Sequence, residues 1–458
     1  MIRCALPVTL VSCVLLASVT CHVDAAEWKA GVARLAITPE KPMRLSGYAG
    51  RNKPAEGKLH DLWVKALALE DASGQRLLLL TMDLVGIDKD LSDSICKQIM
   101  EKHKISRDAI MINVSHTHTG PIVGRNLRAM YDLTAAERDQ IDAYSEFLIA
   151  RTLTAATDAL GALKPARLAW GNGKTDFAVN RRNNLERSVP ALIAAGGLKG
   201  PVDHDVPVLR VTATDGTLLV IVFGYACHCT LLNTIQVSGD YAGFAQAKLE
   251  ASHNGAIAMF MAGCGADQNP LPRRSVALAE KYGQMLADAV AATLKTELKA
   301  IEANCSAKFV LQDLSFKEIP NKEQIGDWLK DKDPNRKRYA EYLNSEIQVK
   351  GALLQGYPYP VQIWQLGKEL TLIGLGGEVV VDYSLRLKSE FPAGSVWVAG
   401  YCNDVMAYIP SVRVLKEGGY EGKDSMLFYG LPSVWSDTIE ELIIAKVKEL
   451  TAAVNKTR

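Results

Sequence analysis

Residues 62–83 read LWVKALALEDASGQRLLLLTMD, and this stretch decides the fold class. Its two apolar runs flank the turn-forming Ala72-Ser73-Gly74, which predicts two strands joined by a short connection. Apolar residues then recur at helical spacing, at Leu91, Ile95 and Ile99, before AIMINVS at 109–115 returns to strand character. The order strand, helix, strand predicts an α/β fold with a mixed β-sheet core layered with helices.

The rest of the chain continues this mixed pattern. TAAE at 134–137 is a capping box that begins a helix, and Asp215-Gly216 turns a hairpin between two apolar strands. Further helices are predicted near 243–252 and 274–299 and, as a charged and solvated excursion, within 320–350. Because no repeat or low-complexity linker interrupts residues 27–458, we expect one domain, in which a C-terminal part after about residue 305 could be loosely separate.

The charge balance points to no polyanionic partner. The 458 residues carry 52 Lys and Arg against 51 Asp and Glu, so no summed field attracts nucleic acid or an anionic membrane surface. Beyond the N-terminus no segment has the uninterrupted apolar length of a transmembrane helix. We therefore expect a small-molecule or lipid substrate, while the oligomeric state stays open.

Residues 1–26 have the layout of a cleaved signal peptide. Arg3 precedes an apolar stretch, and Ala25-Ala26 supply a small-residue cleavage site. Cys21 follows Thr20, without the small residue that a lipoprotein acceptor has immediately before it, so we do not expect a lipid anchor there. These features predict export of the mature protein to the periplasm or the medium.

Export permits disulfides, but the cysteines do not form a disulfide scaffold. Six lie beyond the predicted signal: Cys96, Cys227, Cys229, Cys264, Cys305 and Cys402. Six in so long a chain allow one or two bridges, whose pairing the spacing does not give. No CxxC motif occurs, so a cysteine zinc site is not expected.

The stretch SHTHTGP at 115–121 is a candidate metal site. If 109–115 is a strand, His116 and His118 project from the same side of its end and can share a pocket. Neutral imidazole is a good zinc ligand, and a catalytic zinc keeps a position for water. The motif alone leaves three interpretations open: two ligands, one ligand with a catalytic neighbour, or two polar loop residues.

Other segments offer further donors. His228 ends an apolar strand in GYACHCTLLN, where regular alternation would turn Cys227 and Cys229 to the opposite side. Alone it could equally be a buried core histidine. Glu378 follows paired glycines at the end of another apolar strand, which favours a ligand held close to backbone. Tyr408 and Tyr420 lie in GYCNDVMAYIPS and GYEG, and each alone could be an ordinary aromatic residue.

Ten short motifs occur along the chain in a characteristic order: AITP, GYAGR, GKLHDLWVKALALED, SHTHTGP, AVNRRN, GYACHCTLLN, SGDYAGFA, LGGEVV, NDVMAYI and GYEG. In this order they resemble the neutral or alkaline non-lysosomal ceramidases. The resemblance implies a zinc hydrolase with one zinc ion per chain, held by His116, His228, Glu378 and Tyr408. It implies that His118 faces the scissile bond and that Arg181 and Tyr420 act on the substrate side. A zinc ion with these ligands could lower the pKa of bound water toward neutrality and so make water the nucleophile.

The sequence departs from this family at two places. Where ceramidases carry a serine proposed to take part in amide cleavage, GCGADQNP puts Gln268 between Asp267 and Asn269. Ceramidases also have an immunoglobulin-like domain after the catalytic domain, and the sequence ending at Arg458 leads us to expect the catalytic domain without it.

These departures keep the function open. The leading hypothesis is hydrolysis of an N-acyl sphingosine or a related N-acyl lipid. The alternatives are a family relative acting on another ester, lactone, amide or sugar conjugate, and a non-catalytic metal-containing binding protein. Asp267, Gln268 and Asn269 are candidates for substrate contact or support of the site.

Three further polar residues lie in segments that match the family. Asp83 ends an apolar strand and could hydrogen-bond a metal histidine or cap the next helix. Asp240 and His60 could support the site or be structural. A second, structural cation is neither predicted nor excluded.

Overall fold

The computed structural model describes residues 1–2 and 27–456. Its largest element is a nine-stranded mixed sheet with the order β4-β3-β2-β1-β5-β7-β8-β9, in which β11 also pairs with β5. The strands are β1 Trp28–Ala36, β2 Trp63–Glu70, β3 Arg76–Met82, β4 Ile110–Val114, β5 Lys164–Lys174, β7 Asp205–Ala213, β8 Leu218–Tyr225, β9 Ile257–Ala262 and β11 Lys299–Ile301. The prediction of a mixed sheet layered with helices is confirmed.

The stretch 62–83 forms the predicted strand pair. β2 and β3 are antiparallel, and helix α1 (Lys89–His103) then crosses to β4, which pairs parallel to β3. The side chain of Asp88 accepts a hydrogen bond from the backbone N–H of Leu91 and so caps α1. Leu91, Ile95 and Ile99 are buried on the inner face of this helix, as their spacing predicts.

The other predicted elements of the first half also form. Thr134 and Glu137 make a complete capping box at the start of α2 (Ala135–Gly161). β7 and β8 form the hairpin that turns at Asp215-Gly216. Helices α4 (Asp240–Ser252) and α5 (Val276–Leu294) pack with α2 on the outer face of the large sheet.

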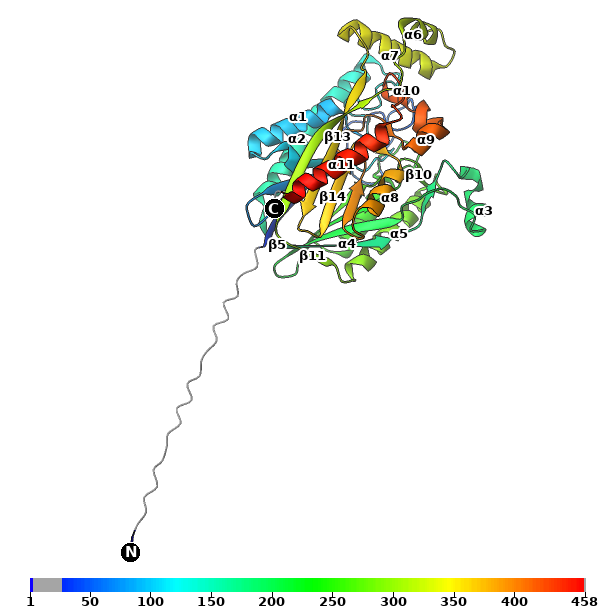
Figure 1. Cartoon of the computed structure of the whole chain (residues 1–458). Helices are drawn as coiled ribbons and strands as arrows, with labels where there is room; N and C mark the ends of the chain where they lie inside the picture. Colours follow the sequence, from blue (N-terminus) through cyan, green and yellow to red (C-terminus); the bar gives the residue numbers. More distant parts are fainter. Residues whose placement is uncertain (3–26, 457–458) are drawn as a thin grey trace.

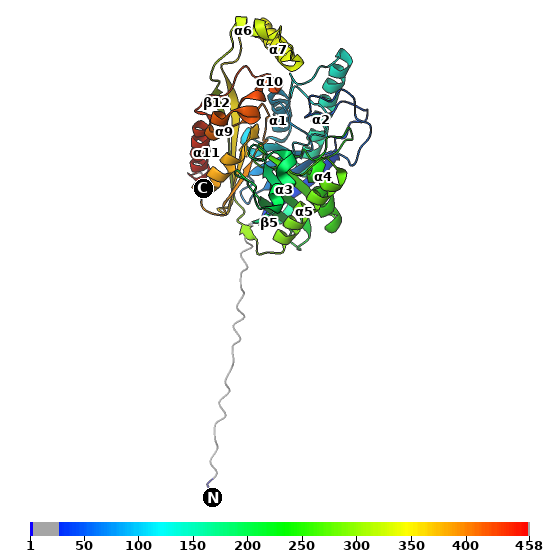
Figure 2. The same cartoon turned by 90° about the vertical axis from the view of Figure 1, so that its right-hand side faces the viewer.

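The second half of the chain adds a smaller sheet. Its strands, in the order β12-β13-β14-β16, are Cys305–Ser315, Gly356–Leu366, Leu370–Leu375 and Val396–Ala399. Its helices are α8 (Val381–Glu390) and α11 (Ile439–Lys456), and α11 packs on β12 and β13. Figure 2 shows α11 on one side of the molecule and α2, α4 and α5 on the other.

The two sheets face each other across one apolar interior. Leu67, Leu79 and Met261 of the large sheet line the same small cavity as Trp364 and Trp397 of the small sheet. A single cluster of buried side chains includes residues of both sheets. The architecture is therefore helix, sheet, sheet, helix, and the part after residue 305 is packed against the part before it.

Several short elements gather at one end of this sandwich. They are β6 (Ala178–Asn180), β10 (Gln268–Pro270), β15 (Glu378–Val379), β17 (Tyr408–Ile409), α9 (Val412–Glu417), the π-helical turn η3 (Tyr420–Asp424) and α10 (Met426–Tyr429). β6 pairs with β10, and β15 pairs with β17. Most of the residues predicted to form the site lie in or beside these elements.

Two helical segments project from the body. α6 (Lys322–Trp328) and α7 (Pro334–Lys350) confirm the predicted excursion within 320–350 and stand at the top of Figure 1. The short α3 (Val189–Ala194) extends from the side of the molecule in the same view. Within residues 1–2 and 27–456, no helix combines the length and the apolarity needed to cross a membrane.

Two further predictions concern the signal peptide and the disulfide bonds. The signal-peptide residues 3–26, including Cys21, lie outside the described residues, so that prediction stays a prediction. In the described part of the chain each of the six cysteines carries a free thiol, and all but Cys305 are buried. Cys227 and Cys229 are thus core residues.

Candidate metal centre

The loops that follow β4 and β8 carry the three histidines of the site. Asn113 on β4 anchors the first of these loops: its side-chain Oδ1 accepts from the backbone N–H of Ala262 at 2.9 Å, and its Nδ2 donates to the carbonyl of Gly400 at 2.8 Å. These bonds join β4 to β9 and to the segment after β16. The histidine loops therefore open at one end of the sandwich.

His116 and His118 share a pocket for a reason other than the predicted one. β4 ends at Val114, and His116 has a left-handed backbone with φ of 61°. Strand alternation therefore does not orient the two rings. The turn brings them into a T-shaped contact with centroids 4.8 Å apart, and their Nε2 atoms lie 3.1 Å from each other.

Glu378 and Tyr408 approach from the second half of the chain. They lie opposite each other in the parallel pair β15 and β17. Gly376 is required before Glu378, because a Cβ atom there would come within 2.6 Å of the Pro360 ring. Gly377 adopts φ of 72°, a left-handed conformation that favours glycine. The paired glycines thus let β15 pass close to its neighbours.

Four donor atoms converge between these loops. Oε2 of Glu378 lies 3.1 Å from Nε2 of His116 and 3.0 Å from Nε2 of His228. The phenolic oxygen of Tyr408 lies 3.2 Å from Nε2 of His228. In a tetrahedral zinc site, metal–ligand bonds of about 2.1 Å put neighbouring ligand atoms about 3.4 Å apart. The four donors fit around one small divalent cation.

His118 is also near this point. Ligand nitrogens of His116, His118 and His228 all lie within 4.8 Å of one another, so these three could hold a metal ion as well. Two ligand sets are therefore geometrically available, one with three histidines and one with two histidines, Glu378 and Tyr408.

The outer ring nitrogens distinguish the three histidines. Nδ1 of His116 donates to the carbonyl of Val85 at 2.5 Å, and Nδ1 of His228 donates to the carbonyl of Gly265 at 2.8 Å. Such contacts fix the tautomer with its lone pair on Nε2, as is usual for metal-binding histidines. Nδ1 of His118 is buried and has no hydrogen-bond partner among the described residues.

Burial and charge keep the histidines and Glu378 in their metal-binding forms. Burial, with a smaller contribution from the nearby Arg181, lowers the pKa of His228 to about 4. Burial, together with His116 and His228, also holds the pKa of His118 well below its usual value. Burial raises the pKa of Glu378, but contact with His116 and His228 outweighs it, so the pKa lies well below the ordinary carboxyl value.

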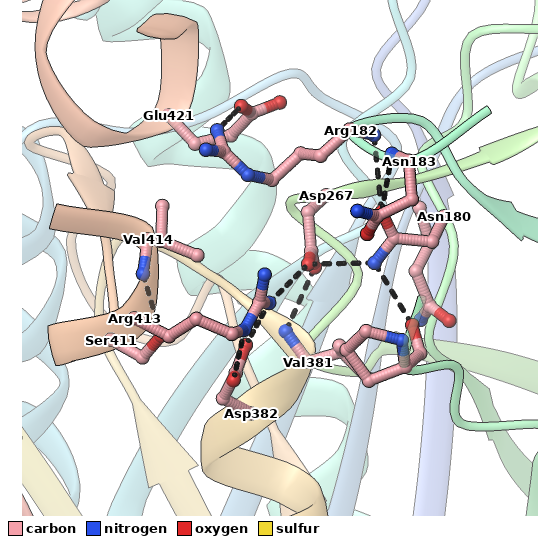
Figure 3. Close-up of polar contacts among 12 residues, drawn as sticks. Asn180, Arg182, Asn183, Asp267, Val381, Asp382, Ser411, Arg413, Val414 and Glu421 are labelled. Atoms are coloured by element: carbon pink, nitrogen blue, oxygen red, sulfur yellow. Dashed lines mark hydrogen bonds and ion pairs between the residues drawn. The ribbon is translucent and has the colours of Figure 1, made fainter. Parts of the chain in front are cut away.

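Arg181 reaches Tyr408 from β6. Its guanidinium donates to the phenolic oxygen of Tyr408 at 3.1 Å, to Oδ1 of Asn269 at 3.3 Å and to Oε1 of Glu421 at 2.7 Å. Glu421 also pairs with Arg182, a contact drawn in Figure 3. Tyr420 stands beside Tyr408 with ring centroids 5.3 Å apart and is 39% exposed, so it lies at the rim of the site.

The turn with Gln268 supports the centre from behind. The side-chain amide of Gln268 donates to the carbonyl of Ala226 and accepts from the backbone N–H of Asp203 at 3.0 Å. The backbone carbonyl of Gln268 accepts a hydrogen bond from the backbone N–H of His228 at 3.0 Å. The amide group is thus occupied by backbone, and Asn269, not Gln268, contacts Arg181.

Asp267 is a structural junction. As Figure 3 shows, its carboxylate accepts from the backbone N–H of Val381 at 2.9 Å and from the Asn180 amide at 3.1 Å, with Arg413 at 3.7 Å. Burial raises its pKa to about 6. These contacts tie β6 to the start of α8 and keep Asp267 from the converging donors.

Three other predicted residues are also structural. Asp83 bonds neither a metal histidine nor a helix end, because its carboxylate accepts from the backbone N–H of Trp63 and the amide of Gln246. Asp240 accepts from the backbone N–H groups of Leu232 and Tyr241. His60 accepts from the backbone N–H of Gly239 at 2.7 Å, and burial lowers its pKa to about 4.

The site also contains residues that the sequence pattern did not predict. Tyr429 on α10 donates its phenolic hydrogen to Oε1 of Glu378. The Tyr401 ring lies against His116 with centroids 4.6 Å apart. Glu421 orients Arg181. Glu421 and Tyr401 stand in the quoted motifs GYEG and GYCNDVMAYIPS, whereas no local pattern marks Tyr429.

Residues 28–296 match the family model for neutral/alkaline non-lysosomal ceramidase, N-terminal. The chain belongs to this ceramidase family. The matched region contains His116, His118, Arg181 and His228, whereas Glu378, Tyr408 and Tyr420 lie beyond it. Membership shows a hydrolase family whose members are named for ceramide cleavage.

Individual ceramidases are similar to parts of this chain. The neutral ceramidase of Drosophila melanogaster is 25% identical over 246 residues, and that of Drosophila pseudoobscura pseudoobscura is 24% identical over 248. The aligned parts are 52% and 51% of this chain but only 34% of each relative. The chain thus matches about a third of the length of these curated relatives.

Solved structures extend the similarity in fold to nearly the whole chain. Neutral ceramidase from Pseudomonas aeruginosa has a TM-score of 0.73 at 18% identity, over 95% of this chain and 75% of its own. A ceramidase complexed with C2 gives 0.73 at 16% identity, over 94% and 76%. The ceramidase fold therefore includes the strands that carry Glu378 and Tyr408.

Proposed function

We propose that this ceramidase-family protein is a zinc-dependent amidohydrolase that cleaves the amide bond of an N-acyl lipid. The observation that carries the proposal is the convergence of His116, His228, Glu378 and Tyr408 within 3.0 to 3.2 Å contacts. Two imidazoles, a carboxylate and a phenol form a donor set suited to zinc. When bound, zinc supplies a water nucleophile at neutral pH and polarises a carbonyl group.

The ligand set that we favour leaves His118 free for proton transfer. Its unpartnered Nδ1 supports this choice, because the tautomers of the other two histidines are fixed by backbone carbonyls. An imidazole whose tautomer is not fixed can take up a proton at one nitrogen and release it to the leaving amine. His118 is the proposed general acid.

Arg181 and Tyr420 are the proposed stabilisers of the negative charge that develops on the carbonyl oxygen. Arg181 is oriented by Glu421 and Asn269, so its guanidinium needs little reorganisation during the reaction. Tyr420 lies at the rim beside Tyr408 and offers a phenolic donor toward a substrate entering there. Together they supply fixed donors on the substrate side.

Water is the preferred nucleophile because the Gln268 turn offers no hydroxyl at the position of the family serine. Gln268 is also fully buried, and its amide nitrogen and oxygen bond the backbone of Ala226 and Asp203. The replacement of the family serine by Gln268 also agrees with one alternative, a related hydrolase that acts on an ester, lactone or sugar conjugate. A binding protein without activity would have little use for a buried His118 whose Nδ1 has no hydrogen-bond partner among the described residues.

The proposal is tested by metal analysis combined with a substrate screen. We expect about one zinc per chain and release of fatty acid from N-acyl sphingosines or other N-acyl lipids, in parallel with zinc content. Esters, lactones and glycosides in the same screen test the alternative. A purified, folded protein that binds no zinc, or that binds zinc but cleaves none of these substrates, would disprove the proposed function.

A further inference from the structure

A second pocket of about 400 Å³ lies next to the metal centre. It is lined by Tyr48, Ala49, Gly50, Arg51, Asn233 and Arg274. Its charged lining consists of two guanidinium groups, with no carboxylate among these residues. The Tyr48 ring lies near both, with its centroid 4.6 Å from Cζ of Arg51 and 5.4 Å from Cζ of Arg274.

The two nearest carboxylates, Glu186 and Asp240, offset only part of the charge of Arg51, Arg273 and Arg274. Glu186 comes within 4.0 Å of Nε of Arg274, but both of its oxygens are bonded to Arg273, at 3.0 and 2.7 Å. Asp240 has both oxygens bonded to backbone N–H groups, those of Leu232 and Tyr241. Arg274 itself donates to the phenolic oxygen of Tyr48 at 3.0 Å, and burial keeps the pKa of that phenol raised. The pocket therefore has excess positive charge.

Arg51 places a buried positive charge in the pocket lining. It is only 8% exposed, and its terminal nitrogens donate to the backbone carbonyls of Ser46, His118 and Thr234. Its Nε has no hydrogen-bond partner in the part of the chain that the structure describes. A buried guanidinium that forms no ion pair with a carboxylate of the described residues is costly, so this environment favours a ligand that brings negative charge.

The pocket adjoins the proposed general acid. The ring of Tyr48 contacts the ring of His118 edge-on with centroids 4.8 Å apart, and Arg51 donates to the His118 carbonyl. His118 would protonate the leaving amine, so a substrate group in this pocket belongs to the amine half of the molecule. This step rests on the proposed function.

We propose that this pocket binds an anionic group on the amine half of the substrate, such as a carboxylate, sulfonate or phosphate. Arginine is suited to this task because its planar fork can bond two oxygens of one anion. The substrate class is then an N-acyl amino acid or a related N-acyl amino sulfonate or phosphate, in preference to a neutral N-acyl amino alcohol. Arg274, whose side chain is 34% exposed, is the specificity-determining residue.

The test compares substrates that share one acyl chain. N-dodecanoyl-β-alanine, N-dodecanoyl-taurine and N-dodecanoyl-phosphoethanolamine carry the three anions, and N-dodecanoyl-ethanolamine is neutral. With the zinc-loaded full chain we expect kcat/KM to favour at least one anionic substrate by about tenfold or more, the ratio given by one charge-assisted hydrogen bond. The best of the three identifies the anion, and the preference should shrink at high salt.

Substitutions at Arg274 connect the preference to the pocket. Arg274→Gln should reduce the ratio of anionic to neutral kcat/KM to near one, mainly through KM, whereas Arg274→Lys should retain part of it. Arg167→Gln is the matched control, because Arg167 lies on β5 and pairs with Glu27 outside the pocket, so it should leave the ratio unchanged. Circular dichroism would verify that each variant is folded.

A binding measurement separates this inference from the proposed function. Isothermal titration of the chelator-treated full chain with N-dodecanoyl-taurine and N-dodecanoyl-ethanolamine should show tighter binding of the anion, and Arg274→Gln should abolish the difference. Equal binding of the two, or a difference that Arg274→Gln leaves intact, would overturn the inference even if both substrates were cleaved. Anion-selective binding without cleavage would instead support the anion-binding pocket and contradict the proposed amidohydrolase activity.

Discussion

Tyr429 donates a hydrogen bond to Oε1 of Glu378, the carboxylate whose other oxygen lies 3.0 Å from Nε2 of His228. The bond holds the carboxylate so that Oε2 faces the two histidines. Residues that orient a ligand in this way commonly contribute 10- to 100-fold to metal affinity. We therefore expect Tyr429→Phe to weaken zinc binding by about 10- to 100-fold, measured by competition with a fluorescent chelator.

Tyr401→Phe is the matched control for this change. The Tyr401 ring also lies in the site, against His116, but its hydroxyl is buried without a partner among the described residues. Removing that hydroxyl should leave zinc affinity within about twofold of the parent protein, because no hydrogen bond is lost. Equal effects of the two substitutions would show that the Tyr429 hydroxyl does not orient Glu378.

The two histidines of SHTHTGP should respond differently to removal. His116→Ala and His228→Ala should lose most of the bound zinc, because each removes a donor whose tautomer a backbone carbonyl fixes. His118→Ala should keep about one zinc per chain and lose hydrolysis by about 100-fold or more, the usual contribution of a general acid. Zinc content by mass spectrometry and kcat on the same samples distinguish these outcomes. Loss of zinc from His118→Ala would favour the three-histidine ligand set.

Glu421 should matter for catalysis more than its neighbour Glu417. Glu421 bonds Arg181 at 2.7 Å, whereas Glu417 pairs with Arg182 and Arg413 near the surface. Glu421→Gln should misorient Arg181 and lower kcat/KM by about 10- to 100-fold, since small displacements of a positioned group cost that much. Glu417→Gln should stay within about twofold, as exposed ion pairs contribute little. If both variants retain full activity, Glu421 does not orient Arg181 for the reaction.

Restoring a serine in the GCGADQNP turn should damage the protein and not improve it. Gln268→Ser would leave the backbone N–H of Asp203 and the carbonyl of Ala226 buried without their partner. Each unsatisfied group costs about 1–3 kcal/mol, so we expect the free energy of unfolding to fall by about 2–6 kcal/mol. Urea denaturation measures this, and ceramide hydrolysis should not rise. A stable Gln268→Ser variant with increased ceramidase activity would contradict the role given to this glutamine.

The local sequence pattern is sufficient to predict the elements in the first half of the fold. The strand pair 63–82, helix α1 with its stripe from Leu91 to Ile99, and the capping box at Thr134 all follow from spacing and short-range hydrogen bonds. The packing of the small sheet on the large one did not follow, since it depends on contacts between residues hundreds of positions apart. A loosely separate part after residue 305 was therefore an open possibility that only the packed interior could address.

The candidate site was only partly accessible to the same reasoning. His116 and His118 were expected together, yet the expected cause was strand pleating and the observed one is a left-handed turn. The order of the family motifs associates Glu378 and Tyr408 with these two histidines, although the spacing of the residues along the sequence does not. Tyr429 lies 51 residues from its partner Glu378 in a four-residue helix, where no periodicity exists to reveal a role.

The parallel pair of β15 and β17 has a consequence for stability. It presents Glu378 and Tyr408 to histidines that lie after β4 and β8, in the other half of the chain. A cation held by all four would be a cross-link between two halves that also meet through apolar packing and through hydrogen bonds such as that from Asn113 to Gly400. Because such an ion binds the assembled protein and not separate halves, it would stabilise the folded chain in proportion to the logarithm of its concentration. Chelation would then lower the unfolding temperature of both sheets together, since they share one buried core.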